Sequence, residues 1–251
     1  MSTSSSPSPE PGAPTPTPIT VAVPALAGIR RGLVVVAHPD DESFGLGAIL
    51  TALVGSGIEL RLLCFSAGEA STVGAARDLA TRRRGELVAA AHVLGLAAVR
   101  MKGMPDGRLS GVPQERLRRL IESELESAEL LVAFERAGVT RHPDHVAVTA
   151  AALAVAADRG LLFLEWGVPG EVADGLRREL GADFDAMDAR PPLPVVIAVD
   201  RSLQLRAIAC HRSQDPDNPV LRTRLRLLGP REWLRVTSPV ASRVQGVGLS
   251  A

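Results

Sequence analysis

The sequence is poor in several residue types, and each shortage argues against a class of protein. Its 251 residues include two cysteines, one lysine and no tyrosine. Cys64 and Cys210 form no paired cysteine motif, so neither a disulfide-stapled domain nor a zinc finger is expected. The 28 basic side chains are balanced by 28 acidic ones. Because there is no basic surplus, we expect no nucleic-acid partner.

Long apolar runs are missing as well. Asp158 and Arg159 interrupt the longest candidate, residues 146–164, so we expect no membrane span. The first residues show no basic segment followed by an apolar one, so we expect no signal peptide and a cytoplasmic protein. The sequence leaves open whether the chain forms a homo-oligomer.

The composition that remains is sufficient for one globular domain, since 46% of the residues are hydrophobic. Residues 1–27 begin with a stretch rich in Pro, Ser and Thr, which predicts a flexible tail. We expect a single domain over residues 28–236 and a frayed segment over 237–251.

Short apolar runs alternate with helical patterns along this domain. The runs predict strands at residues 33–37, 58–65, 98–101, 130–134, 161–166 and 195–200. Helices are predicted at residues 48–54, 75–94, 113–127, 145–157 and 202–213, with a short one near 172–180. This alternation predicts an α/β fold, a Rossmann-like three-layer sandwich with a mostly parallel sheet, in which ligands bind beyond the carboxyl ends of the strands.

Two similar polar motifs follow predicted strands. The first, His-Pro-Asp-Asp-Glu at residues 38–42, comes directly after the strand at 33–37, and the second, His-Pro-Asp-His at residues 142–145, follows the strand at 130–134. From the composition, two His-Pro-Asp tripeptides arise by chance with a probability on the order of 10⁻⁴. Two imidazoles, one carboxylate and a water form the usual catalytic zinc site, and a second carboxylate nearby can deprotonate that water. The motifs therefore predict metal-assisted hydrolysis.

A nucleotide-binding oxidoreductase is a weaker interpretation. Gly45 and Gly47 follow the first strand, but position 50 is Leu50 and seven residues separate Gly45 from the predicted end of that strand. A dinucleotide-binding fingerprint needs a third small residue and a turn set tightly against the strand.

The paired motifs resemble those of the PIG-L/LmbE-like family of zinc-dependent N-acetylglucosaminyl deacetylases, and the similarity extends over most of residues 31–236. The resemblance implies that His38, Asp41 and His145 bind Zn²⁺ and that Asp40 is the general base. Iron or cobalt remains open, because this donor set does not select strongly for zinc.

Further roles follow from the same resemblance. His142 matches the residue that stabilises the oxyanion and is also a candidate to protonate the leaving amine, and Asp144 would hold the imidazoles in their working tautomer. Glu42 has either a helix-capping or a catalytic role. Four residues are expected to contact the substrate: Glu69, Arg83, Asp106 and Arg141.

The family implies an enzyme that removes an acetyl group from an N-acetylated amino sugar or sugar conjugate by attack of a metal-bound water. A metal hydrolase of another amide or ester, and a non-catalytic sugar-binding protein on the same scaffold, remain alternatives. Arg141 stands where the family often has a small residue, and we expect its side chain to point into the cleft and attract an anionic substrate. Without a tyrosine in the chain, the general acid has no assigned residue.

Overall fold

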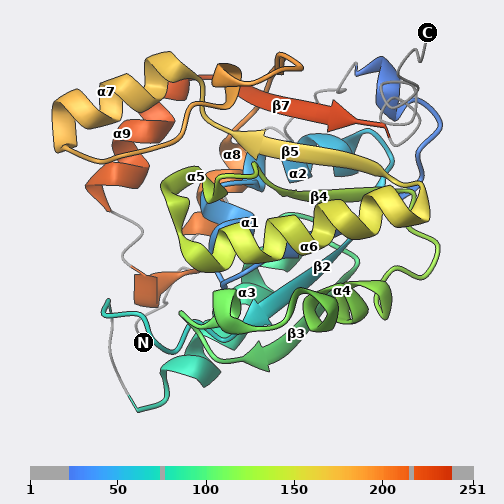
Figure 1. Cartoon of the computed structure of the whole chain (residues 1–251). Coiled ribbons are helices and arrows are strands. Elements are labelled where there is room, and N and C mark those ends of the chain that lie inside the picture. Colours follow the sequence, from blue (N-terminus) through green and yellow to red (C-terminus); the bar gives the residue numbers. More distant parts are fainter. Residues whose placement is uncertain (1–22, 74–76, 215–217, 239–251) are drawn as a thin grey trace, which may run out of the picture.

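In the computed structural model, residues 23–73, 77–214 and 218–238 are described, and they form one seven-stranded sheet between two layers of helices (Figure 1). The strand order is β3-β2-β1-β4-β5-β7-β6. Every neighbouring pair from β3 to β5 is parallel, and β7 runs antiparallel to both β5 and β6. The strands are β1 Arg31–Val36, β2 Glu59–Ser66, β3 Ala98–Met104, β4 Leu130–Phe134, β5 Leu162–Gly167, β6 Val195–Ala198 and β7 Arg231–Thr237.

The central strands β1 and β4 are apolar except for Arg31 at the start of β1, because both of their faces are covered. In β1, Val34 and Val36 enter one hydrophobic core, whereas Leu33 and Val35 enter the core on the opposite face. All five residues of β4 are buried. The expected three-layer arrangement with a mostly parallel sheet is therefore confirmed.

Two helices cover one face of the sheet and five cover the other, in the described part of the chain. The core that contains Leu33 is covered by α4 Gln114–Glu122 and α6 Pro143–Arg159. The opposite core is covered by α2 Gly47–Gly55, α3 Leu79–Val93, α7 Gly170–Leu180, α8 Ser202–Ile208 and α9 Pro219–Leu228. The short helices are α1 Asp41–Phe44, α5 Gly138–Arg141 and the 3-10 turns η1 Pro24–Leu26, η2 Leu109–Gly111, η3 Met187–Ala189 and η4 Arg212–Gln214. Among the described helices none is both long and apolar enough to cross a bilayer.

Two elements near the end of the chain were not predicted. Helix α9 begins at Pro219, where the Asn218 side chain accepts hydrogen bonds from two backbone N–H groups, and it ends before Gly229 at positive φ. Strand β7 is not a continuous apolar run, because Glu232 and Arg235 interrupt its apolar residues. Both side chains are buried in the fold and lie within ion-pair distance of an oppositely charged side chain.

The ordered domain begins before residue 28, which corrects the boundary of the predicted flexible tail. Val23 and Leu26 are buried in the core beside α2, and residues 24–26 form η1. Residues 1–22 lie outside the described part. At the other end, Thr237 still pairs with Phe163 in the sheet, and residues 239–251 of the predicted frayed segment also lie outside the described part.

Candidate active site

The two polar motifs meet at the carboxyl edge of the sheet. Strands β1 and β4 are parallel neighbours. The strands β2 and β3 lie on one side of this pair and β5 lies on the other, so the direction of strand order reverses between β1 and β4. The first motif follows β1 and runs into α1; the second follows β4 and α5 and forms the start of α6. The crevice at such a switch point is where ligands bind in open α/β sheets.

The first motif is held in place by its own carboxylates. Asp41 Oδ2 accepts hydrogen bonds from the backbone N–H of Ala37 at 3.1 Å and of His38 at 2.9 Å. Glu42 Oε2 accepts one from the N–H of Asp40 at 3.0 Å. Asp40 has a φ of 115°, which only a strongly constrained non-glycine residue adopts. These bonds therefore fix an otherwise unfavourable backbone.

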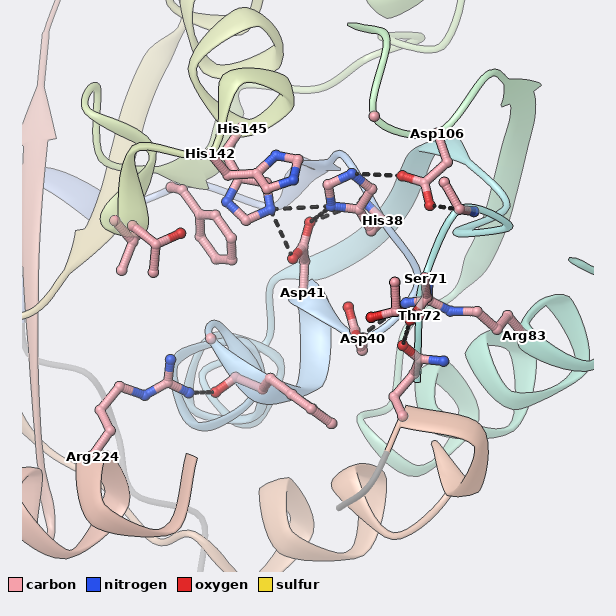
Figure 2. Close-up of a pocket in the computed structure, with 18 of the residues that line it drawn as sticks. His38, Asp40, Asp41, Ser71, Thr72, Arg83, Asp106, His142, His145 and Arg224 are labelled. Atoms are coloured by element: carbon pink, nitrogen blue, oxygen red, sulfur yellow. Dashed lines mark hydrogen bonds and ion pairs between the residues drawn. The ribbon is translucent and has the colours of Figure 1, made fainter. Parts of the chain in front are cut away.

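The three predicted metal ligands come together (Figure 2). His38 Nδ1 lies 3.1 Å from His145 Nε2, and the latter lies 3.2 Å from Asp41 Oδ1. His38 Nδ1 is 3.8 Å from Asp41 Oδ2. Tetrahedral bonds of about 2.0–2.2 Å place neighbouring ligand atoms about 3.4 Å apart. The observed separations fit a small divalent cation among these atoms.

The outer nitrogens of both imidazoles support the same conclusion. His145 Nδ1 lies 3.1 Å from the carbonyl oxygen of Gly138. His38 Nε2 lies 3.0 Å from Asp106 Oδ1 and 3.3 Å from Asp144 Oδ2. Oxygens of these kinds accept N–H bonds, so each neutral ring turns an unprotonated nitrogen toward the other. This is the ring orientation that second-shell partners impose on metal-binding histidines.

The charges around His38 also favour a cation. Burial alone would lower the pKa of His38, but hydrogen bonds to Asp106 and Asp144 and the charge of Asp41 raise it to about 10. Ligand atoms of His142 also lie within 4.8 Å of those of His38 and His145, so His142 borders the same space. The donor set of nitrogen and carboxylate oxygen atoms suits zinc, and also iron or cobalt.

Asp40 lies beside the ligand cluster and borders the pocket. Its side chain is 19% exposed, and its Oδ2 accepts a hydrogen bond from Arg83 Nη2 at 3.0 Å. Burial raises the pKa of Asp40 to about 7, although the guanidinium of Arg83 opposes this shift. A carboxylate with such a pKa can exchange a proton near neutral pH.

His142 caps the N-terminus of α6. Its Nδ1 accepts a hydrogen bond from the N–H of Asp144 at 3.2 Å, so the ring proton of the neutral form resides on Nε2. Burial and the neighbouring charges of His145 and His38 lower the pKa of His142. His142 is therefore a neutral N–H donor at the pocket wall.

Asp144 lies behind the ligand cluster. Its side chain is fully buried, with Oδ2 against His38 and Oδ1 accepting the N–H of Leu109 at 2.9 Å. Of the predicted ligands it contacts His38, and such a contact can hold that imidazole in one tautomer.

Two of the four predicted substrate contacts, Arg83 and Asp106, also hold the site together. Arg83 is buried and donates to the carbonyl oxygens of Gly68 and Pro39 as well as to Asp40. Both Asp106 oxygens have partners, since Oδ2 accepts the N–H of Ala70 at 2.9 Å and Oδ1 faces His38. Arg83 and Asp106 still line the pocket.

Glu69 and Arg141 do not line it. Glu69 is exposed and accepts the backbone N–H of Asp106 at 2.9 Å. The expectation that Arg141 points into the cleft is wrong: its side chain is 70% exposed, and Nη2 lies 3.0 Å from Asp185 Oδ1. The left-handed backbone of Arg141, with a φ of 58°, belongs to the irregular turn before α6.

The contacts of Glu42 are structural ones within and beside the first motif. It is fully buried, and its Oε1 lies 2.6 Å from Nε2 of the equally buried His211. Ser43 Oγ donates to the same oxygen at 2.5 Å. Since Glu42 also holds the N–H of Asp40, this pair supports the backbone of the predicted general base.

The pocket has a volume of about 480 Å³, and several of its walls were not predicted. Ser71 and Thr72 line the pocket (Figure 2), as does Gln214, whose Oε1 accepts a hydrogen bond from Ser71 Oγ at 2.9 Å. Three apolar rings and Arg224 also line it: Phe44, Phe134 and Trp166. Gln214 lies in a polar segment that the sequence singled out. No sequence pattern marks Arg224 or Trp166, because they reach the pocket from helices and strands far along the chain.

The chain is similar to several known proteins. Residues 33–156 match the PIG-L family, described as GlcNAc-PI de-N-acetylase. The chain is 30% identical over 198 residues to an N-acetylglucosaminyl-phosphatidylinositol de-N-acetylase from Bos taurus, covering 74% of this chain and 76% of that protein. It is 33% identical to a 1D-myo-inositol 2-acetamido-2-deoxy-alpha-D-glucopyranoside deacetylase from Kineococcus radiotolerans, covering 68% and 62% of the two chains.

A solved structure shares the architecture. The N,N'-diacetylchitobiose deacetylase from Pyrococcus horikoshii superposes with a TM-score of 0.65 over 86% of this chain and 87% of that one. The sequence identity is 20%, so this likeness bears on the fold alone.

Proposed function

Because the chain belongs to the PIG-L family, we propose that it is a metal-dependent hydrolase that removes the acetyl group from an N-acetylated amino sugar, within a sugar conjugate. The observation that carries the proposal is the meeting of His38, Asp41 and His145 beside a separate carboxylate, Asp40, in one pocket. The products are acetate and the free amine of the sugar.

In this proposal His38, Asp41 and His145 hold one divalent cation, and Zn²⁺ is the ion we expect. Bound there, the cation supplies a Lewis acid that polarises the acetyl carbonyl and lowers the pKa of the attacking water. Asp106 and Asp144 keep the Nε2 proton of His38 directed away from the cation.

Asp40 acts as the general base. It borders the pocket, and Arg83 and the Glu42-bound backbone hold its carboxylate in place. Its carboxylate can take a proton from water and return it to the leaving nitrogen. This cycle needs no tyrosine, which the chain lacks.

His142 stabilises the negative charge that develops on the carbonyl oxygen. Its Nδ1 is occupied by the backbone N–H of Asp144, so its Nε2–H is free to donate. Such a preorganised donor typically contributes about 10²–10³-fold in rate.

The test measures both reaction products, acetate and the free amine, with protein whose metal content has been determined. The full chain, loaded in parallel with Zn²⁺, Fe²⁺ or Co²⁺, is incubated with N-acetylglucosamine and with several of its glycosides, including an inositol glycoside. Acetate and free amine should appear in equal amounts. Asp158→Asn, which changes an exposed aspartate paired with Arg118, serves as the matched control and should keep full activity.

Two outcomes would contradict this proposal. Metal-loaded protein that binds the glycosides and releases no acetate would support the non-catalytic alternative. Release of acyl groups from other amides or esters, with none from N-acetyl sugars, would support a different hydrolase.

A further inference from the structure

Arg224 reaches the wall of the pocket from α9. The residue is 8% exposed and lines the pocket, and Figure 2 places its guanidinium at the opposite end from Asp106. Its Nη2 donates to the carbonyl oxygen of Phe44, and its Cζ lies 5.2 Å from the ring centroid of Trp166. These two contacts orient the guanidinium.

The remaining donors of Arg224 have no partner in the part of the chain that the structure describes. Nε is buried and unpaired. Nη1 makes no hydrogen bond there either and has accessible surface, and Arg224 lines the pocket.

The charge of Arg224 is also unbalanced. The nearest acidic influence on it is Glu232, whose carboxylate is taken by Trp166 Nε1 at 2.7 Å and by Arg201 Nη1 at 2.5 Å. No carboxylate of the described residues lies within 4 Å of the Arg224 guanidinium. The guanidinium groups of Arg201 and Arg224 thus share the one buried carboxylate of Glu232.

The other buried arginines behave differently. Arg83 lies 3.0 Å from Asp40, and Arg235 lies 3.5 Å from Glu165. An unpaired buried charge is costly unless something compensates it. Burial lowers the pKa of Arg224 to about 10, so the side chain still carries its charge at neutral pH.

We propose that Arg224 binds an anionic group, a carboxylate or a phosphate, on the part of the substrate that extends from the sugar. This inference rests on the proposed deacetylation and names the substrate class for it. The rings of Phe44, Phe134 and Trp166 line the same pocket and give the extending part an apolar wall. A guanidinium with free N–H groups beside such a wall suits an anion at the end of a sugar conjugate.

The test uses three glycosides of N-acetylglucosamine that share one aglycone skeleton and end in a carboxylate, a phosphate or a hydroxymethyl group. Zinc-loaded full-length protein is compared with Arg224→Gln and Arg224→Lys. For Arg224→Gln we expect KM to rise roughly 10–100-fold for the anionic glycosides, the usual effect of losing a charge-assisted hydrogen bond. Values of kcat, and both constants for the neutral glycoside, should stay within about twofold. For Arg224→Lys, KM for the anionic glycosides should lie between the values of the wild type and of Arg224→Gln.

Arg231→Gln is the matched control. The Arg231 guanidinium also lies 5.2 Å from a tryptophan centroid, that of Trp233, but it is outside the pocket. This variant should change none of the constants.

The outcomes separate the two proposals. Equal losses on all three glycosides, or a loss confined to kcat, would overturn the anion site and assign Arg224 a packing role. Binding of the deacetylated products, followed by thermal shift, gives a readout without turnover: if the wild type hydrolyses nothing but prefers the anionic products through Arg224, the anion site stands and deacetylation falls.

If Arg224→Gln does not fold, the Lys variant decides. A wild-type preference for anionic glycosides that shrinks about tenfold in Arg224→Lys supports the site. No preference in the wild type overturns it.

Discussion

The two loops at the carboxyl edge of the sheet contain the same tripeptide, yet its aspartate has a different position in each. In the first loop, His38 belongs to the ligand cluster and Asp40 borders the pocket. In the second, His142 borders the pocket, while Asp144 is fully buried against His38. Both histidines line the pocket, but of the two aspartates only Asp40 does.

The backbone explains the different positions of the two aspartates. Asp40 has a left-handed conformation at the start of α1, and its N–H is held by Glu42. Asp144 lies in the first turn of α6, and its N–H donates to Nδ1 of the N-cap residue His142. A shared tripeptide therefore does not specify a shared role; the conformation that each loop adopts decides which side chain faces the substrate.

The largest expected effect separates the two histidines of the second loop. His145→Ala should remove most of the bound metal and abolish activity, because it deletes one of three ligands. His142→Ala should keep the metal and lose roughly 10²–10³-fold in kcat, since only a donor to the carbonyl oxygen is lost. Metal analysis and acetate release on the same samples check both results. Full metal occupancy in His145→Ala would remove His145 from the ligand set.

The next effect separates the two adjacent aspartates of the first loop. Asp40→Asn should retain the metal and lose roughly 10²–10⁴-fold in turnover, the usual contribution of a positioned general base. Asp41→Asn is the comparison variant and should weaken metal binding instead. If both variants lose metal equally, the division of roles between these residues is wrong.

Asp144→Asn tests the buried member of the second tripeptide. Its carboxylate contacts His38 Nε2, so its loss should reduce metal affinity roughly 10–100-fold, as loss of an outer-shell partner does. Competition with a chelator measures this effect. A loss of turnover at saturating metal, without a change in affinity, would instead place Asp144 among the proton-transfer groups.

Much of this architecture could be predicted from the residues, because parallel strands buried on both faces are continuous apolar runs. The His-Pro-Asp motifs were likewise visible, since each follows a predicted strand, the first directly and the second after a short loop. Strand β7 could not be found this way: Glu232 and Arg235 are acceptable inside the protein only because Arg201 and Glu165 pair with them, and sequence shows no such partners.

The substrate-facing residues were harder for a related reason. Glu69 accepts the backbone N–H of Asp106, and Arg141 pairs with Asp185, so neither of these two side chains lines the pocket. Arg224 comes from a helix that the sequence analysis did not predict. Which polar groups keep free donors depends on contacts between distant segments.

A smaller effect concerns the stability of the metal-free protein. Burial raises the pKa of Asp40 from 3.8 to about 7, so the folded state binds this proton more tightly than the unfolded chain. Stability therefore falls as pH rises from about 4 to about 7 through this group. With chelator present, Asp40→Asn should melt several degrees above the wild type at pH 8, because a domain of this size shifts by roughly 2–4 °C per kcal/mol. The difference should vanish near pH 4; a difference that is constant with pH would contradict the shifted pKa.

The smallest expected effect is that of Arg141→Gly, immediately before the second tripeptide. Arg141 points away from the pocket and pairs with Asp185 in an exposed ion pair, a kind of interaction that contributes little to stability. Glycine also accepts the φ of 58° at this position without strain. We therefore expect unchanged KM for neutral and anionic glycosides and a melting temperature close to that of the wild type. Kinetics with the carboxylate and hydroxymethyl glycosides provide the measurement, and Arg224→Gln provides the contrast. A selective rise in KM for the carboxylate in Arg141→Gly would show that this side chain turns into the pocket when substrate binds, and that the second loop, like the first, supplies a charged group to the substrate.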